Sequence, residues 1–145
     1  METQKRTAGN TGRDGGNGET TELLMEKITE KTQGLEILEK AIEISSVCMA
    51  LSSQLRESHD NSYGEKLKRC ALNVYENIAQ SIDAYSETDL FSFLSLAKKN
   101  LLEAAHILLI LNKSQLISSS DTVNLFNELS LLNQEISQFE KSQCN

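Results

Sequence analysis

The sequence predicts an all-α protein, an antiparallel up-down-up-down four-helix bundle with a disordered N-terminal tail. Apolar residues recur at alternating steps of three and four through most of residues 35–139, which is the spacing of helices that face other helices. The chain contains no Pro, and five of its seven Gly lie in the first 18 residues, so the remainder has few residues that interrupt helices. No run alternates strictly between apolar and polar residues, and we therefore expect no sheet.

Two parts of the chain differ in composition. Residues 1–33 are expected to be a flexible tail, because their first half is rich in Gly, Thr and Asn and offers nothing to bury. Residues 34–145 are expected to form one domain, the bundle itself. A short amphipathic helix can form within the tail, where it either docks on the bundle or stays solvated. It would span residues 20–31 and use Leu23, Leu24 and Ile28.

The first bundle helix is predicted from about Leu35 to Leu55, with residues 56–61 as a polar connection. It carries one entirely apolar stripe, and beside it a second stripe that becomes smaller and more polar toward the end. The first stripe is Ile37, Ala41, Ile44, Cys48, Leu51 and Leu55. The second is Leu35, Leu38, Ile42, Ser45, Met49 and Ser52.

Serines mark the starts of the other three helices. Ser62 and Glu65 have the S-x-x-E spacing of a capping box, Ser86 is a predicted N-cap, and Ser119 or Ser120 is predicted to cap the last helix. The second helix presents Leu67, Ala71, Val74, Ile78, Ile82 and Tyr85, widened by Cys70 and Ala79. The fourth helix presents Leu125, Leu129, Leu132, Ile136 and Phe139.

The third helix, predicted over residues 87–112, has the widest apolar surface. Its main seam is Leu90, Leu94, Ala97, Leu101, Ala104, Leu108 and Leu111. Further apolar side chains lie outside that seam, namely Phe91, Phe93, Leu102, Ala105, Ile107 and Leu109. Because monomers seldom expose so much apolar surface, this width favours self-association.

The formal net charge of −7 makes the chain a poor general binder of nucleic acid, since phosphate contacts need clustered Lys and Arg. Such a role would require a local basic patch, or patches repeated around an oligomeric ring. The candidate residues are Lys66, Lys68 and Arg69 near the start of the second helix, and Lys98 and Lys99 opposite the Leu seam of the third. They form either a nucleic-acid or partner site, or an ordinary solvated surface with local ion pairs.

The three cysteines favour a reducing, cytoplasmic setting. Cys48 and Cys70 fall on apolar stripes and are expected to be small buried thiols rather than a disulfide or a redox pair, and Cys144 leaves the count odd. The N-terminus has basic residues but no apolar core of a secretory signal.

No catalytic or metal-ligand set accompanies the stripes, so the protein is expected to be neither an enzyme nor a binder of a metal or cofactor. Glu103 and His106 have the E-x-x-H spacing of di-iron bundles, but the other histidine, His59, has Arg56 in the Glu position. Asn77 lies in an otherwise apolar region. Its amide is expected to bond a neighbouring helix and fix the register, and the alternative is a contact surface.

Three segments carry a resemblance to a known family. Residues 35–43 read LEILEKAIE, residues 69–80 read RCALNVYENIAQ, and residues 89–97 read DLFSFLSLA. In this order they resemble the first, second and third helices of the bacterial four-helix-bundle proteins encoded in 23S rRNA intervening sequences. Leu38 stands where that family usually has Trp. The resemblance spans about residues 33–141.

The resemblance implies an oligomeric accessory scaffold. Relatives in the superfamily include the accessory variability determinants of diversity-generating retroelements, which are non-enzymatic, typically pentameric bundles that bind a reverse transcriptase and its RNA template. The implied partners are thus further copies of the chain, a reverse transcriptase or another nucleic-acid enzyme, and RNA, with no membrane.

One departure favours a protein partner over direct RNA binding. After the Asn-Ile-Ala core at residues 77–79 the family continues with Gly and basic residues, whereas this chain has Gln80, Ser81, Ile82 and Asp83. The alternative function is therefore a structural or regulatory helical module for protein–protein interaction, with no nucleic-acid contact.

Overall fold

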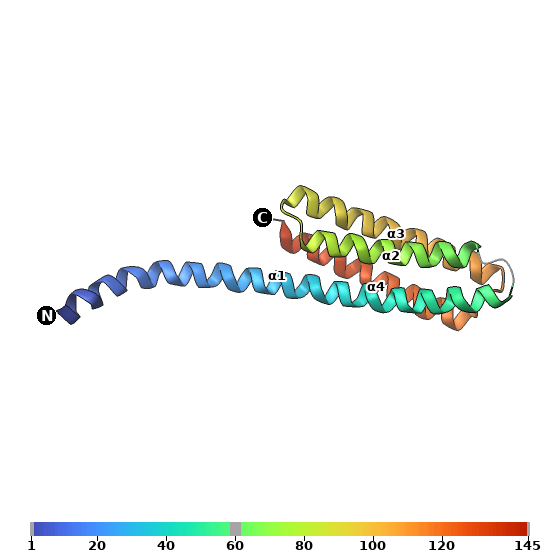
Figure 1. Ribbon diagram of the computed structural model, residues 1–145, viewed down its shortest axis with the longest axis horizontal. Helices are drawn as coiled ribbons and strands as arrows, with labels where there is room; N and C mark the ends of the chain where they lie inside the picture. Colours follow the sequence, from blue (N-terminus) through green and yellow to red (C-terminus); the bar gives the residue numbers. More distant parts are fainter. Residues whose placement is uncertain (1, 59–61, 145) are drawn as a thin grey trace. The chain divides into compact units, whose positions relative to one another are not determined.

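The computed structural model describes the backbone of residues 2–58 and 62–144, and the side chains of residue 18 and residues 20–55 and 62–144. Every regular element in these ranges is a helix, which confirms the expected all-α class. The elements, drawn in Figure 1, are α1 (Glu2–Ser58), α2 (Ser62–Ile82), α3 (Glu87–Lys113) and α4 (Ser119–Gln143).

The chain divides into two compact units, Met1–Thr32 and Gln33–Asn145. In the first unit the backbone is helical from Glu2 onward, so α1 begins far earlier than the predicted Leu35. The helix expected at residues 20–31 is present as part of it, with its apolar side chains exposed. The flexibility expected of residues 1–33 stays a prediction.

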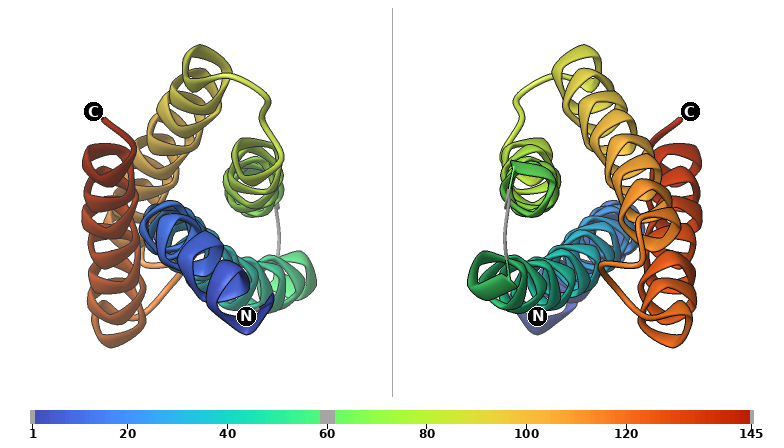
Figure 2. Two further views of the ribbon diagram at one scale, coloured as in Figure 1. Left: turned by 90° about the vertical axis from the view of Figure 1, so that its left-hand side faces the viewer. Right: turned by 90° about the vertical axis from the view of Figure 1, so that its right-hand side faces the viewer.

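The second unit is the four-helix bundle. The colours of Figure 1 show that consecutive helices run in opposite directions, as the up-down-up-down prediction requires. In the end-on views of Figure 2, α3 lies beside α2 and α4, and it packs against both. The α1 helix contacts α2 where the Ser45 hydroxyl donates to the Ala71 carbonyl over 3.2 Å, and it contacts α4 through an ion pair between Lys40 and Glu135.

The core contains the residues that helical spacing predicts. The whole first stripe of α1 and the whole predicted face of α4 are buried, and so is the α3 seam apart from half-buried Leu90. Each fully buried Leu or Ile side chain contributes about 1.5–3 kcal/mol relative to an exposed one. The largest buried side chains come from all four helices: Ile37, Leu67, Ile78, Leu94, Leu108, Leu111, Leu132 and Ile136.

One apolar prediction is wrong. Tyr85 is fully exposed because α2 ends at Ile82, which places the tyrosine in the turn before α3. In the second α1 stripe three of the four larger side chains are about half-exposed and Leu38 packs against the core, whereas Ser45 and Ser52 are buried at 6 % and 1 % exposure. Small residues allow α1 and α2 to approach closely here, as the bond from Ser45 to α2 shows. The exposed members are Leu35, Ile42 and Met49.

Serine caps start the helices close to where they are predicted. Ser86 caps α3, since its hydroxyl oxygen accepts the Asp89 amide proton over 3.1 Å. The cap of α4 is Ser118, one residue before the predicted Ser119 or Ser120, and it accepts from the Asp121 amide over 3.0 Å. The α2 helix begins at Ser62, and residues 59–61 of the predicted connection lie outside the described ranges.

The end of α3 turns the chain back toward α4. Gln115 has a φ of 59°, the left-handed conformation that ends many helices and that glycine adopts most easily. The Gln115 amide donates to the Asn112 carbonyl and the Leu116 amide donates to the Leu111 carbonyl, each over 2.9 Å. These two bonds satisfy carbonyls that the helix end would otherwise leave unpaired.

The polar contact between helices is not made by Asn77, and that prediction is wrong. The Asn77 amide donates within its own helix, to the Asn73 carbonyl over 2.8 Å. Asn73 makes the contact between helices instead, since its side chain donates to Asn100 of α3 over 3.4 Å. The register contact therefore lies one turn earlier along α2.

Cys48 and Cys70 are buried free thiols, as predicted. Burial raises the pKa of Cys48 to about 12, and burial together with the nearby Glu103 carboxylate raises the pKa of Cys70 to about 11. The usual thiol pKa is 9.0, so the unfolded chain ionises first as the pH rises. The stabilisation from keeping these thiols neutral is therefore complete below pH 9, and it is lost as the pH rises toward 11 for Cys70 and toward 12 for Cys48.

Two adjacent leucines of α4 test the packing. Leu132→Ala removes a fully buried side chain and is expected to lower the free energy of unfolding by about 2–5 kcal/mol. Leu131 is 44 % exposed, and Leu131→Ala is expected to change it by less than about 1 kcal/mol. Urea unfolding followed by circular dichroism measures both, and equal losses would contradict the register of α4.

Thiol titration tests the burial of the cysteines. In the native protein at pH 8 an aromatic disulfide reagent is expected to label exposed Cys144 rapidly, and Cys48 and Cys70 only after denaturation. Rapid native labelling of three thiols per chain would show that the core is open. Cys144→Ser is the control that identifies the fast thiol.

Candidate functional site

The predicted basic residues Lys66 and Arg69 line a surface pocket between α2 and α3, which we call the basic pocket. The two cations are exposed and lie on one face of α2, three residues apart. The remaining lining residues are Tyr63, Cys70 and Asn73 from α2 and Glu103, His106 and Ile107 from α3.

An aromatic ring and a carboxylate organise this pocket. The Lys66 ammonium lies 5.1 Å from the centroid of the Tyr63 ring, which is a cation–π contact. The Glu103 carboxylate accepts a hydrogen bond from the Cys70 thiol over 3.6 Å, and both residues line the pocket. Two exposed cations beside an aromatic ring can hold a phosphate group. Tyr63 lies outside the predicted apolar stripes and was missed, and its three-residue spacing from Lys66 is the signal that could have found it.

The other three predicted cations do not join this pocket. Lys68 pairs with Glu65 of its own helix over 3.5 Å. Lys98 was predicted to lie opposite the Leu seam of α3. It lies beside the seam instead, where it forms an ion pair with Glu140 of α4. Lys99 is exposed elsewhere on α3. The five candidates are therefore not one site, and Lys66 and Arg69 are the pair with the most accessible charge.

The E-x-x-H pair gains no third metal ligand among the described residues. Glu103 and His106 both line the basic pocket, where Glu103 faces a thiol. Across the described residues, no three His, Cys, Asp or Glu side chains gather closely enough to hold a metal ion.

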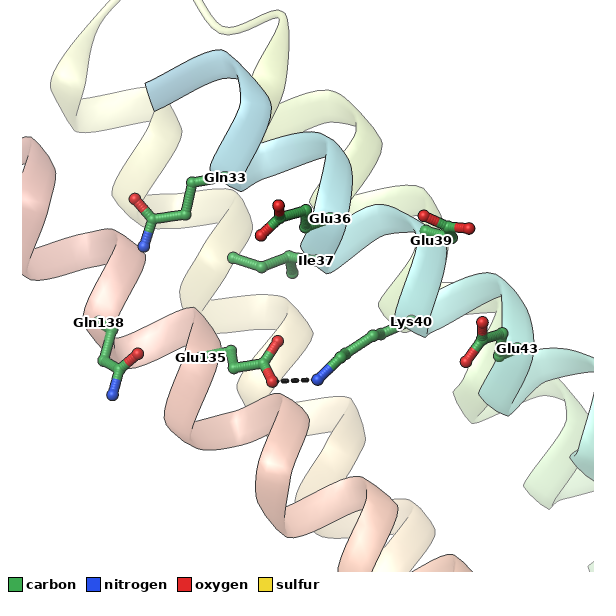
Figure 3. A pocket seen from close by; sticks show the side chains of 8 residues that line it. All are labelled: Gln33, Glu36, Ile37, Glu39, Lys40, Glu43, Glu135 and Gln138. Atoms are coloured by element: carbon green, nitrogen blue, oxygen red, sulfur yellow. Dashed lines mark hydrogen bonds and ion pairs between the residues drawn. The ribbon is translucent and has the colours of Figure 1, made fainter. Parts of the chain in front are cut away.

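A second surface, between α1 and α4, has the opposite charge. Two pockets that share Glu43 follow one another along these helices, and we call them together the acidic groove. Figure 3 shows its first half, where Lys40 reaches from α1 to Glu135 on α4. Hydrogen bonding to Glu135 is the largest cause that raises the pKa of Lys40. The carboxylates of the groove are Glu36, Glu39, Glu43, Asp121, Glu128 and Glu135.

A third surface, between α3 and α4, is uncharged and carries exposed apolar side chains among Asn, Ser and Thr. Leu109, Val123 and Phe126 are between 37 % and 56 % exposed, and they line a pocket that we call the apolar groove. None of the described residues that line this groove carries a charge. Part of the wide apolar arc predicted for α3 is thus open to solvent, and Leu102 is 59 % exposed one heptad before Leu109. No helix in the described part of the chain is sufficiently long and apolar to cross a bilayer.

Comparison with known proteins agrees with this architecture. A crystal structure of a protein with unknown function from the S23 ribosomal protein family, from Bacteroides thetaiotaomicron VPI-5482, is similar to this chain with a TM-score of 0.71 and 18 % sequence identity. The match covers 75 % of this chain and 98 % of the other, and at this identity it shows a shared fold. No curated protein matches the chain significantly. The family model of 23S rRNA-intervening sequence proteins matches residues 33–138, nearly the whole bundle, and the chain belongs to this family.

Proposed function

We propose that the protein is a non-enzymatic, self-associating adaptor that binds a nucleic-acid enzyme and its RNA. The resemblance to accessory variability determinants favours a reverse transcriptase as that enzyme and a pentamer as the assembly. The observation that carries the RNA-binding part is the basic pocket, where Lys66 and Arg69 are exposed on one face beside Tyr63.

Local charge, rather than total charge, supports RNA binding at this pocket. The chain has a net charge of −7, so its average field repels phosphates. Lys66 and Arg69 face one engaged carboxylate, Glu103, and this leaves a local excess of positive charge. In an oligomer the pocket would occur once per subunit, and several weak phosphate contacts on one RNA add up to useful affinity.

The apolar groove between α3 and α4 supports self-association. Because the groove has no charged lining residue, an uncharged partner face that includes apolar side chains fits it, whereas a face with unpaired charges does not. A second copy of the chain offers such a face, and two identical grooves can meet around a symmetry axis. Burial of Leu109, Val123 and Phe126 would then remove half-exposed apolar surface from water.

The second candidate is a helical protein–protein interaction module without nucleic-acid contact. The exposed Gln80 and Asp83 favour it, because they stand where the family usually carries Gly and basic residues. The two candidates differ in salt dependence. Phosphate contacts release counterions and weaken steeply with salt, whereas apolar association does not.

Charge reversal in the basic pocket tests RNA binding. In low salt we expect Lys66→Glu/Arg69→Glu to weaken binding of a fluorescein-labelled oligouridine about tenfold or more, measured by anisotropy. Losing two phosphate contacts should also make the slope of log affinity against log salt shallower by about 1.4. The control Lys27→Glu/Lys31→Glu changes net charge equally at exposed positions outside the bundle unit.

Three outcomes of this experiment count against the RNA-binding proposal. They are an equal loss in both double variants, no effect of the pocket variant, and wild-type binding that is absent or indifferent to salt. If the wild-type protein assembles but binds no RNA, the second candidate function holds.

Substitution in the apolar groove tests self-association. Leu109→Asp/Phe126→Asp places two carboxylates in the groove and is expected to shift the protein to monomers in sedimentation velocity at micromolar concentration. Leu131→Asp is the control, because Leu131 is similarly exposed on α4 but does not line the groove. A wild-type monomer, or an unchanged oligomer in the groove variant, would contradict this interface.

A further inference from the structure

We propose that the acidic groove between α1 and α4 is the docking site for a basic amphipathic helix of a partner protein. The proposal deepens the adaptor function by naming the surface that faces the protein partner. It depends on side chains that are separate from the basic pocket, so each can fail without the other.

The carboxylates of the groove form two rows with helical spacing. Asp121, Glu128 and Glu135 follow one another at intervals of seven residues on α4. Glu36 and Glu43 are also seven residues apart, on α1. Seven residues are two helical turns, about 10.5 Å, so each row lies along one face of its helix. The groove therefore offers negative charge on both sides at the repeat of an amphipathic helix.

The floor between these rows is apolar in its second half. Val47 is 48 % exposed there, and buried Leu51 and Leu125 lie beneath it. Ala50 occupies the next position of the α1 row, seven residues after Glu43. It is exposed, and its small side chain leaves room for a neighbouring helix. A helix that places apolar residues on this floor would direct its flanking Lys or Arg toward Glu43, Asp121 and Glu128.

The groove already holds one ammonium group of its own. Lys40 pairs with Glu135, and the charges of Glu128 and Glu43 also raise its pKa. The carboxylates from α4 and α1 thus act together on a cation between them. Among the described residues that line the groove, Lys40 is the single cation against six carboxylates, so most of the negative charge is unmatched.

The charge of the groove selects the kind of occupant. Nucleic acid is repelled, because its phosphates would face two rows of carboxylates. The exposed apolar helix of a second copy, residues 20–31, carries three Glu and two Lys and would also meet net repulsion. A nucleic-acid enzyme, by contrast, carries cationic surfaces for its substrate, and a basic helix at their edge would complement the groove.

A model peptide tests the docking site directly. The probe is a fluorescein-labelled helical peptide of 21 residues, built from Leu, Ala and Lys with Lys at seven-residue intervals on both flanks. We expect it to bind the full chain in low salt, and a matched peptide with Glu in place of Lys not to bind. Glu43→Lys/Glu128→Lys is expected to weaken binding about tenfold or more.

Matched variants separate docking from general charge attraction. Glu76→Lys/Asp83→Lys makes the same change in net charge at exposed positions outside the groove, and binding should stay within about twofold of wild type. Val47→Asn leaves the charge of the groove unchanged and should weaken the peptide through the apolar floor alone. If the double reversal does not fold, as judged by circular dichroism, Glu43→Gln/Glu128→Gln replaces it with an expected loss of about threefold or more.

The proposal is overturned if both reversal variants lose the peptide equally, or if the Glu peptide binds as well as the Lys peptide. It is also overturned if the groove variant dissociates the oligomer, because a second copy would then occupy the groove. Oligouridine binding by the groove variant is measured in parallel. If the groove variant loses the peptide but still binds oligouridine, the two partners bind to separate surfaces. If the wild-type protein binds the peptide but not oligouridine, only the RNA-binding function is refuted.

Discussion

Burial of one apolar seam from each helix is the interaction on which the rest of this structure depends. Leu67, Leu94, Leu108 and Leu132 are completely buried, and they come from three different helices around the α1 stripe. Because each helix turns one face inward, its other faces must lie toward a neighbour or toward solvent. The core thus determines which charged and apolar side chains share an outer surface, and the interaction surfaces follow from that arrangement.

The outer surfaces separate charge by helix pair. The acidic groove lies between α1 and α4, and the basic pocket lies between α2 and α3, the opposite pair in the end-on views of Figure 2. Packed helix axes are about 8–10 Å apart, and screening in physiological salt acts over about 8 Å. In physiological salt the charges of the two surfaces are therefore largely screened from each other. An adaptor needs this property, because a cationic partner and an anionic one must bind without cancelling each other.

Helical spacing was sufficient to predict the fold and its core, because burial repeats with the period of the helix. Helical spacing was insufficient to predict which neighbouring helix a side chain contacts. Asn77 bonds its own helix, Lys98 pairs with α4, and Ser45 is buried beside α2, and each depends on which helix lies next to it. The acidic groove was missed for the same reason. Its rows come from segments some 80 residues apart, and their common surface exists only in the folded bundle.

Amide chemical shifts during titration with oligouridine would show whether folding places opposite charges on separate surfaces. A transverse-relaxation-optimised spectrum of the labelled full chain would follow each helix. We expect shifts in residues 62–73 and 99–107, around the basic pocket, and unchanged positions in residues 36–54 and 121–135. Shifts concentrated along the acidic groove, or spread evenly over the four helices, would contradict this expectation.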